Sequence, residues 1–251
     1  MTAAAAPGRL VRMARGKDRP GCLILPGAGG GLTPYLQLAS LLGGSRAVDF
    51  VRPLGLMPDE EPETSVAQMA ASVLDIVGTA AAATTMATTA AAPRLVVGWS
   101  LGGVVAWELC VRLAEAGHRP DLVVIDSSPL PRVPGPGEDE EIADRMVADL
   151  GPKADPRTVG RVLRTLAAQA AALADYRAES PYPGRVLLLV CSPYDEDGRE
   201  DAVRRWRELA PHLDVVHLDA GHYEVLEPAH LPQLATAIHT FQNQHENQEE
   251  R

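Results

Sequence analysis

The sequence contains few aromatic residues, few cysteines and fewer basic than acidic residues, and each of these shortages argues against a class of protein. Aromatic residues make up only 4% of its 251 residues, so a core has to be built from aliphatic side chains. Basic residues are outnumbered by acidic ones and the net charge is −10, which argues against nucleic acids or anionic membranes as partners. The three cysteines, Cys22, Cys110 and Cys191, lie in or beside apolar runs, so we expect reduced, buried thiols rather than a disulfide framework.

Long hydrophobic runs are also missing. No apolar stretch reaches the length that spans a membrane, and residues 1–21 lack the sustained apolar segment of a secretory signal. We therefore expect a soluble cytoplasmic protein. With 46% hydrophobic residues, the chain is long enough for one globular domain with an inserted subdomain.

One stretch organises the rest of the chain. Residues 94–97, Arg-Leu-Val-Val, form a short, mostly apolar run that predicts a buried strand. Gly98-Trp-Ser-Leu-Gly102 follows, and then apolar residues recur at helical spacing. A strand, a G-x-S-x-G motif and a helix in succession are typical of a nucleophile elbow, with Ser100 as the nucleophile. The flanking glycines fit a turn too tight for a β-carbon.

A second glycine-rich segment follows an earlier strand. Residues 21–26 predict a buried strand and residues 27–31 are Gly-Ala-Gly-Gly-Gly. The Lys and Ser/Thr of a phosphate-binding loop are missing, and so is the G-x-G-x-x-G spacing. We therefore expect an oxyanion loop, in which the N–H of Ala28 faces the N–H of Leu101, the residue after the nucleophile.

Strands and helices alternate along the chain, which predicts an α/β fold with a mostly parallel sheet covered on both faces. No strand is expected between about 129 and 184, where a proline-rich segment precedes two or more helices. We expect residues 1–128 and 185–251 to form the core and 129–184 a helical lid. The Ala/Thr tract 79–92 either prolongs a helix or forms a connector, and the polar tail 243–251 is expected to fray.

A serine nucleophile needs a histidine base, and the base needs a carboxylate that fixes its tautomer. Of seven histidines, only His222 lies in a short glycine-containing loop directly after the last expected strand. The position in the chain does not decide which carboxylate is the acid. Asp126 ends the strand after the elbow helix and Asp195 ends the strand after the lid, and either position suits a Ser, acid, His order.

Several segments resemble the thioesterase domains that end nonribosomal peptide and polyketide synthetases. The resemblance covers about residues 21–238 and depends most on the elbow and on Val-Ile-Asp-Ser at 124–127. It implies an α/β-hydrolase fold and the acid at Asp126. The segments that carry it are Leu25-Pro-Gly-Ala-Gly-Gly30, Gly98-Trp-Ser-Leu-Gly-Gly-Val-Val-Ala-Trp-Glu108, Val124-Ile-Asp-Ser127, Pro181-Tyr-Pro-Gly-Arg-Val186 and Gly221-His-Tyr-Glu-Val-Leu226.

The resemblance also implies an activity and a partner. The expected reaction is release of an acyl chain from the phosphopantetheine thioester of an acyl or peptidyl carrier protein, by hydrolysis or cyclisation, with no metal or cofactor. The alternatives are a free-standing editing (type II) thioesterase, for which Asp195 is the more typical acid, and a small-molecule carboxylesterase. A non-catalytic binding module of the same fold is a further alternative.

Overall fold

The structure is a computed structural model that describes residues 8–16, 19–44, 46–83, 92–192 and 196–249. Its centre is one seven-stranded sheet in the order β1-β3-β2-β4-β5-β6-β7. All neighbouring strands run parallel except β1, which is antiparallel to β3. The strands are β1 (Leu10–Ala14), β2 (Arg19–Leu25), β3 (Arg46–Val51), β4 (Leu95–Trp99), β5 (Asp121–Ile125), β6 (Arg185–Cys191) and β7 (His212–Leu218).

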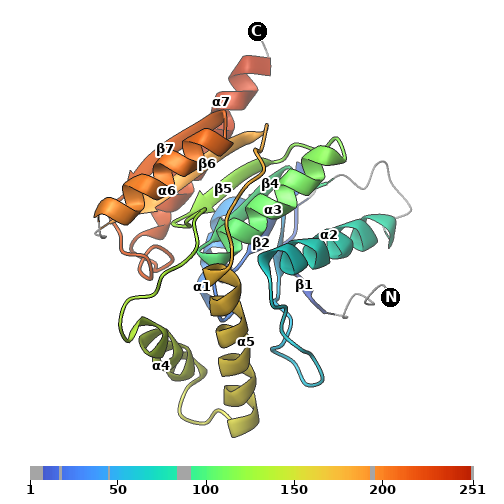
Figure 1. Cartoon of the computed structure of the whole chain (residues 1–251). Coiled ribbons are helices and arrows are strands. Elements are labelled where there is room, and N and C mark those ends of the chain that lie inside the picture. Colours follow the sequence, from blue (N-terminus) through green and yellow to red (C-terminus); the bar gives the residue numbers. More distant parts are fainter. Residues whose placement is uncertain (1–7, 17–18, 45, 84–91, 193–195, 250–251) are drawn as a thin grey trace.

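Helices cover both faces of this sheet (Figure 1). In that view α2, α3 and α6 lie in front of the sheet and α1 and α7 behind it, whereas α4 and α5 lie below, at the end toward which β5 points. The α/β fold expected from the alternation of strands and helices is confirmed. The helices are α1 (Thr33–Gly43), α2 (Val66–Ala83), α3 (Leu101–Glu115), α4 (Glu138–Leu150), α5 (Pro156–Ala174), α6 (Glu196–Leu209) and α7 (Leu231–Glu249).

The central strands are apolar on both sides, as a sheet buried between two helical layers requires. In β5, Leu122 and Val124 face the core under α2, α3 and α6, while Val123 and Ile125 face the core under α1 and α7. The three cysteines are unpaired and buried, which confirms the expectation from their apolar surroundings. Among the described helices, none combines the length and the apolar character needed to cross a membrane.

The strand order places two loops at the same point of the sheet. The chain leaves β2 for β3 on one side and returns to β4 on the other, so β2 and β4 are neighbours. Ligands of open α/β sheets bind outside the carboxyl ends of the strands at such a reversal. The glycine-rich loop after β2 and Ser100 after β4 both lie there.

The structure determines the secondary structure of two segments that the sequence indicated only weakly. The tail expected to fray is helical, because α7 continues to Glu249 through a segment that contains neither glycine nor proline. The start of the Ala/Thr tract prolongs α2 as far as Ala83. Residues 84–91 lie outside the described part of the chain.

Candidate active site

Ser100 occupies a strained turn between β4 and α3. Its φ of 54° lies in the left-handed region, which a residue with a β-carbon rarely adopts and which costs about 1–3 kcal/mol. A β-carbon on Gly98 would lie 2.1 Å from the carbonyl oxygen of Gly102, and one on Gly102 would lie 2.1 Å from that of Leu25. Only glycine fits at either flank, as the sequence predicted for a nucleophile elbow.

Three hydrogen bonds hold the backbone of Ser100 in this conformation. Its N–H donates to the carbonyl oxygen of Ile125 at 2.9 Å. Its own carbonyl oxygen accepts from the Gly103 N–H at 2.9 Å and from the Ser127 hydroxyl at 2.7 Å. Ser127, which directly follows Asp126, thereby fixes the elbow to the end of β5, a role that was not predicted from the sequence.

Asp126 and His222 are brought together from loops 96 residues apart. Nδ1 of His222 lies 2.7 Å from Oδ2 of Asp126, and both side chains are largely buried, at 14% and 9% exposure. A carboxylate oxygen accepts hydrogen bonds, so Nδ1 is the donor of this pair, and in the neutral imidazole Nε2 is then the acceptor nitrogen. Asp195, the alternative acid, lies outside the described residues.

The carboxylate of Asp126 is held on its other oxygen by the neighbouring strand. Oδ1 accepts from the backbone N–H of Cys191, the last residue of β6, at 2.9 Å. Burial, and then the charge of Asp126, raises the pKa of the Cys191 thiol to about 12. The thiol therefore stays protonated at neutral pH.

Trp99 connects the histidine loop to the elbow. Its ring lies against the imidazole of His222, with ring centroids 5.1 Å apart, and its Nε1–H donates to the His222 carbonyl oxygen at 3.1 Å. A β-carbon on Gly27 would lie 2.6 Å from the Trp99 ring, so the glycine-rich loop packs on the same indole. Trp99 stands directly before Ser100, and its position inside the motif was the signal that could have identified it.

The glycine-rich loop presents the amide of Ala28 beside the elbow. The N–H of Gly27 donates to the Tyr35 hydroxyl at 2.9 Å, that of Gly29 to Oε1 of Gln169 at 2.8 Å, and that of Gly30 to the Gly27 carbonyl oxygen at 3.2 Å. Within the described part of the chain, the N–H of Ala28 donates to no such partner. Leu101, as the first residue of α3, likewise has no intrahelical acceptor.

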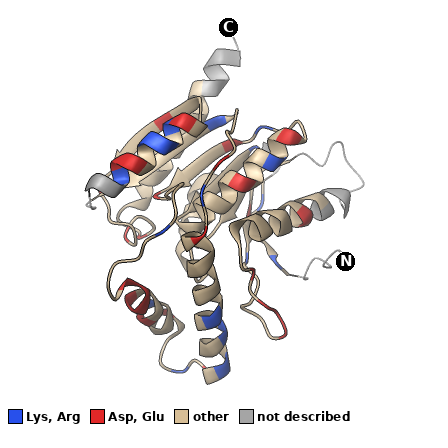
Figure 2. Ribbon diagram, in the orientation of Figure 1, with Lys and Arg blue, Asp and Glu red and all other residues tan. Residues whose placement is uncertain are grey.

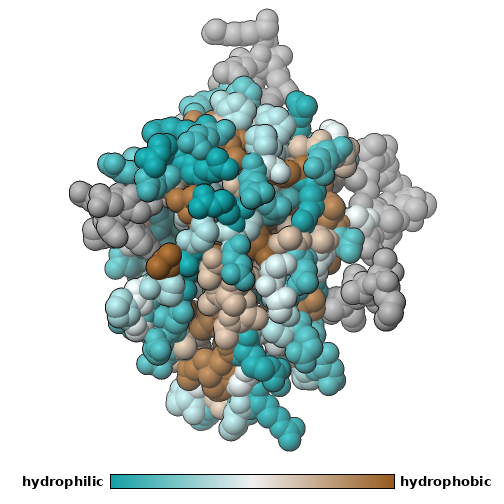
Figure 3. All heavy atoms as spheres, viewed as in Figure 1, coloured by the Kyte–Doolittle hydropathy of each residue, from teal (hydrophilic) through white to brown (hydrophobic). Residues whose placement is uncertain are grey.

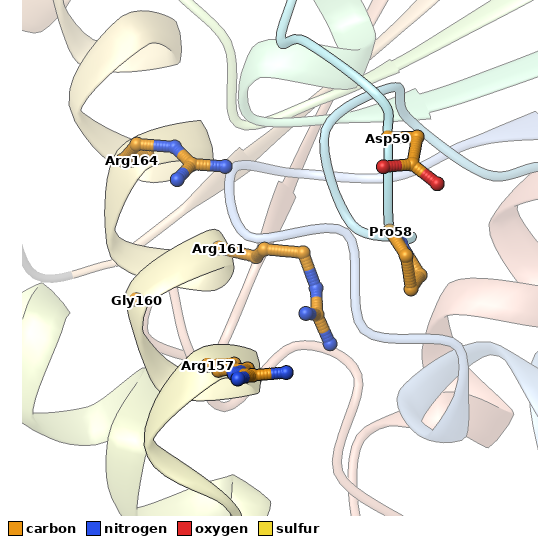
Figure 4. A pocket seen from close by; sticks show the side chains of 6 residues that line it. All are labelled: Pro58, Asp59, Arg157, Gly160, Arg161 and Arg164. Carbon is orange, nitrogen blue, oxygen red and sulfur yellow. The ribbon is translucent and has the colours of Figure 1, made fainter.

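A cavity of about 430 Å³ lies apart from these residues, between α5 and the loop after β3 (Figure 4). Positive charges gather on the outer half of α5 (Figure 2). Arg161 donates to the Leu56 carbonyl oxygen at 3.3 Å, whereas Arg157 and Arg164 are exposed. The lining residues are Pro58, Asp59, Arg157, Gly160, Arg161 and Arg164.

Within the described ranges, no three His, Cys, Asp or Glu side chains are grouped so that they could hold a metal ion. A serine on a strained strand-to-helix turn, an Asp–His pair at the ends of the following strands and a doubly covered parallel sheet together define an α/β-hydrolase.

Comparison with known proteins identifies the family within that class. The pattern of the Thioesterase domain family matches residues 22–241, so the chain belongs to this family, and the resemblance seen in the sequence is confirmed. Thioesterase frbE of Dothideomycetidae sp. (strain 11243) is 32% identical over 109 residues, which is 43% of this chain. That match spans 38% of the length of the relative.

Solved structures agree with this assignment. The NocB thioesterase domain, in covalent complex with a fluorophosphonate nocardicin G analogue, is 30% identical with a TM-score of 0.69, over 88% of this chain and 93% of that one. The Vlm2 thioesterase domain bound with a dodecadepsipeptide has a TM-score of 0.72 at 22% identity, over 91% of this chain and 95% of that one. The second likeness shows the fold alone.

Proposed function

We propose that this protein is a serine thioesterase that releases a peptidyl or polyketide acyl chain from the phosphopantetheine thioester of a carrier protein. The observation that carries the proposal is the 2.7 Å contact between Oδ2 of Asp126 and Nδ1 of His222, on a histidine that packs against the residue before Ser100. In this proposal Ser100 is the nucleophile, His222 the base and Asp126 the residue that orients the base.

The reaction follows from this assignment. The Oγ of Ser100 attacks the thioester carbonyl carbon while Nε2 of His222 takes the hydroxyl proton. The N–H groups of Ala28 and Leu101 stabilise the oxyanion of the tetrahedral intermediate. The intermediate collapses, the carbon–sulfur bond breaks, and the imidazolium returns its proton to the departing thiolate, which leaves an acyl ester on Ser100.

The second half resolves the acyl-enzyme. Water, or a hydroxyl or amine within the acyl chain, gives its proton to His222 and attacks the ester carbonyl carbon. The ester bond to Ser100 breaks, the serine oxygen recovers the proton, and the product leaves as a free acid, a lactone or a lactam.

We further propose that residues 129–184 act as the lid over the acyl chain, with 1–128 and 185–251 as the hydrolase core. None of the residues of α4 is buried. Leu150 and Leu163 are exposed, and apolar residues show on the surface where α4 and α5 lie (Figure 3). Side chains of this kind suit contact with an apolar acyl chain and limit the access of water to it.

The first test uses Ser100→Ala and a panel of synthetic acyl-pantetheine thioesters. Wild-type protein is expected to turn over at least one thioester and to be labelled by a fluorophosphonate, and the variant to do neither. Mass spectra of the products separate hydrolysis from cyclisation. A burst of acyl-enzyme in Ser100→Ala would contradict the assignment of the nucleophile, and absence of labelling in wild type would favour a binding module.

A second comparison separates a thioesterase from a carboxylesterase. The same acyl group is offered as a thioester on a carrier protein, as a thioester on free pantetheine and as a matched oxygen ester. A thioesterase of the proposed kind prefers the carrier-bound form. Equal or faster turnover of the oxygen ester would contradict the proposal.

A further inference from the structure

Gln169, on the lid helix α5, reaches the glycine-rich loop 140 residues earlier in the chain. It is one of the few polar side chains that the fold buries, at 2% exposure. Its Oε1 accepts a hydrogen bond from the backbone N–H of Gly29 at 2.8 Å. A buried amide needs such a partner, and here the partner is the residue next to Ala28.

The bond acts on a turn with two alternative forms. Residues 27–30 form a β-turn closed by the hydrogen bond from the Gly30 N–H to the Gly27 carbonyl oxygen, and Gly29, at its third position, has a φ of +82°. A positive φ there is the mark of a type II turn. Type I and type II turns differ by a rotation of the central peptide, which here joins Ala28 to Gly29.

Gln169 holds that central peptide directly. The N–H of Gly29 belongs to it, so the hydrogen bond to Oε1 favours the type II orientation. In the flipped form the carbonyl oxygen of Ala28 would face Oε1 instead, and two acceptors would oppose each other. The other lid helix supports the same residue, since a β-carbon on Gly29 would lie 2.4 Å from Sδ of Met146 in α4.

We infer that Gln169 is a positioning residue of the oxyanion hole, through which the lid holds in place the turn that carries the N–H of Ala28. The inference rests on the proposed function. It makes the lid part of the catalytic geometry as well as a cover, because displacement of α5 would release the Gly29 N–H and free the turn.

The test replaces Gln169 by Met, which has a similar length and no strong acceptor. We expect kcat for an acyl-pantetheine thioester to fall by about ten- to a hundred-fold, less than or similar to the loss of an oxyanion donor. Binding of a boronic acid, whose adduct with Ser100 places an oxygen in the hole, is expected to weaken in parallel, whereas binding of the free product acid is unchanged. Gln169→Glu keeps an acceptor oxygen and is expected to lose less activity than Gln169→Met.

Thr165→Val is the matched control. Thr165 lies one turn earlier on α5, is fully buried, and its hydroxyl has no hydrogen-bond partner within the described part of the chain. The control is expected to keep wild-type kcat and boronic acid affinity. An unchanged kcat in Gln169→Met, an equal loss in Thr165→Val, or an equal weakening of boronic acid and product acid binding would each overturn the inference.

The experiment also separates this inference from the proposed function. If wild-type protein turns over none of the thioesters, the proposed function fails. The rate at which a fluorophosphonate labels Ser100 then still compares wild type with Gln169→Met, because that reagent also places an oxygen in the hole. Equal labelling rates would overturn the role of Gln169, and slower labelling of the variant would support it.

Discussion

The indole of Trp99 lies against the imidazole of His222 and donates a hydrogen bond to the carbonyl oxygen of the same residue. One side chain thus fixes both the ring and the backbone of His222, the proposed base, relative to the strand that ends beside Ser100. Removing the hydrogen bond while keeping an aromatic face should loosen the loop of His222 without emptying the site.

We therefore expect Trp99→Phe to lower kcat by about ten-fold, since misplacement of a catalytic group by even 1 Å is costly. Steady-state turnover of an acyl-pantetheine thioester measures the effect. Trp107→Phe is the control, because the Trp107 indole donates a bond of similar length, 3.2 Å, to the Ser180 carbonyl oxygen within the core. Trp107→Phe is expected to lower the free energy of unfolding and to leave kcat almost unchanged. A larger loss of kcat in Trp107→Phe than in Trp99→Phe would contradict the role of Trp99.

Asp126→Asn should reduce kcat by about 10³- to 10⁴-fold. The amide oxygen of the variant can still accept from the Cys191 N–H, but its NH₂ group then faces Nδ1 of His222 and favours the wrong tautomer. Fluorophosphonate labelling and thioester turnover both report the loss. Asp214→Asn, at an exposed position on β7, is expected to be neutral, and a fully active Asp126→Asn would return the role of acid to Asp195.

Gly29→Ala should lower both activity and stability. The residue has a φ of +82°, and an added β-carbon would lie 2.4 Å from Sδ of Met146. A destabilisation of about 1–3 kcal/mol is expected from the strained backbone, measured by chemical denaturation. Gly31→Ala is the matched control in the same loop, because nothing lies within 4 Å of its added β-carbon; equal losses in the two variants would contradict this account.

Replacing Arg157 and Arg164 together by Glu should weaken turnover of a carrier-bound thioester and leave turnover of the free pantetheine thioester unchanged. The protein has a net charge of −10, so the exposed arginines of α5 are the kind of local positive surface that could meet an acidic surface of the proposed carrier protein. A several-fold rise in KM for the carrier, reduced by added salt, is the expected result. The double variant of Arg204 and Arg207 on α6 changes the charge equally and should not alter this KM; equal effects of the two double variants would exclude a local docking site.

Glu60 should stabilise the loop beside the glycine-rich turn in a pH-dependent way. Hydrogen bonds from Arg52 lower the pKa of Glu60, against the opposing effect of burial. A lowered pKa means that its contribution is complete above the ordinary pKa of a glutamate and is lost as the pH falls through the folded value. Glu60→Gln should therefore cost about 1–3 kcal/mol of unfolding free energy at pH 7 and almost nothing in strong acid, whereas the exposed Glu61→Gln should show no such trend.

The parts of the site that could be predicted from sequence are those that local chemistry determines. Gly98 and Gly102 identify the elbow because no other residue fits there, and the alternation of strands and helices predicts the sheet. The surroundings of Asp126 could not be predicted in this way. They depend on which strand lies beside β5, and no local pattern in the sequence encodes the pairing with β6 that brings the Cys191 N–H to Asp126.

Gln169 was missed for a related reason. It is a polar residue among alanines on an amphipathic helix, and such a residue faces solvent unless the helix packs on that side. Only the docking of α5 against the glycine-rich loop buries it. The C-terminal tail is the opposite case, in which a local signal was present but was overlooked. The residues after Phe241 include no glycine or proline, which favours a continued helix, but their polar composition suggested a frayed tail.

The placement of Asp126 between its two partners has a consequence for folding. One oxygen is bound by the last residue of β6, and the other by a loop that exists only after β7 has joined the sheet. The pair of Asp126 and His222 is therefore complete only when β6 and β7 have both joined the sheet. Recovery of Ser100 labelling during refolding should thus report completion of the whole sheet rather than formation of the elbow alone.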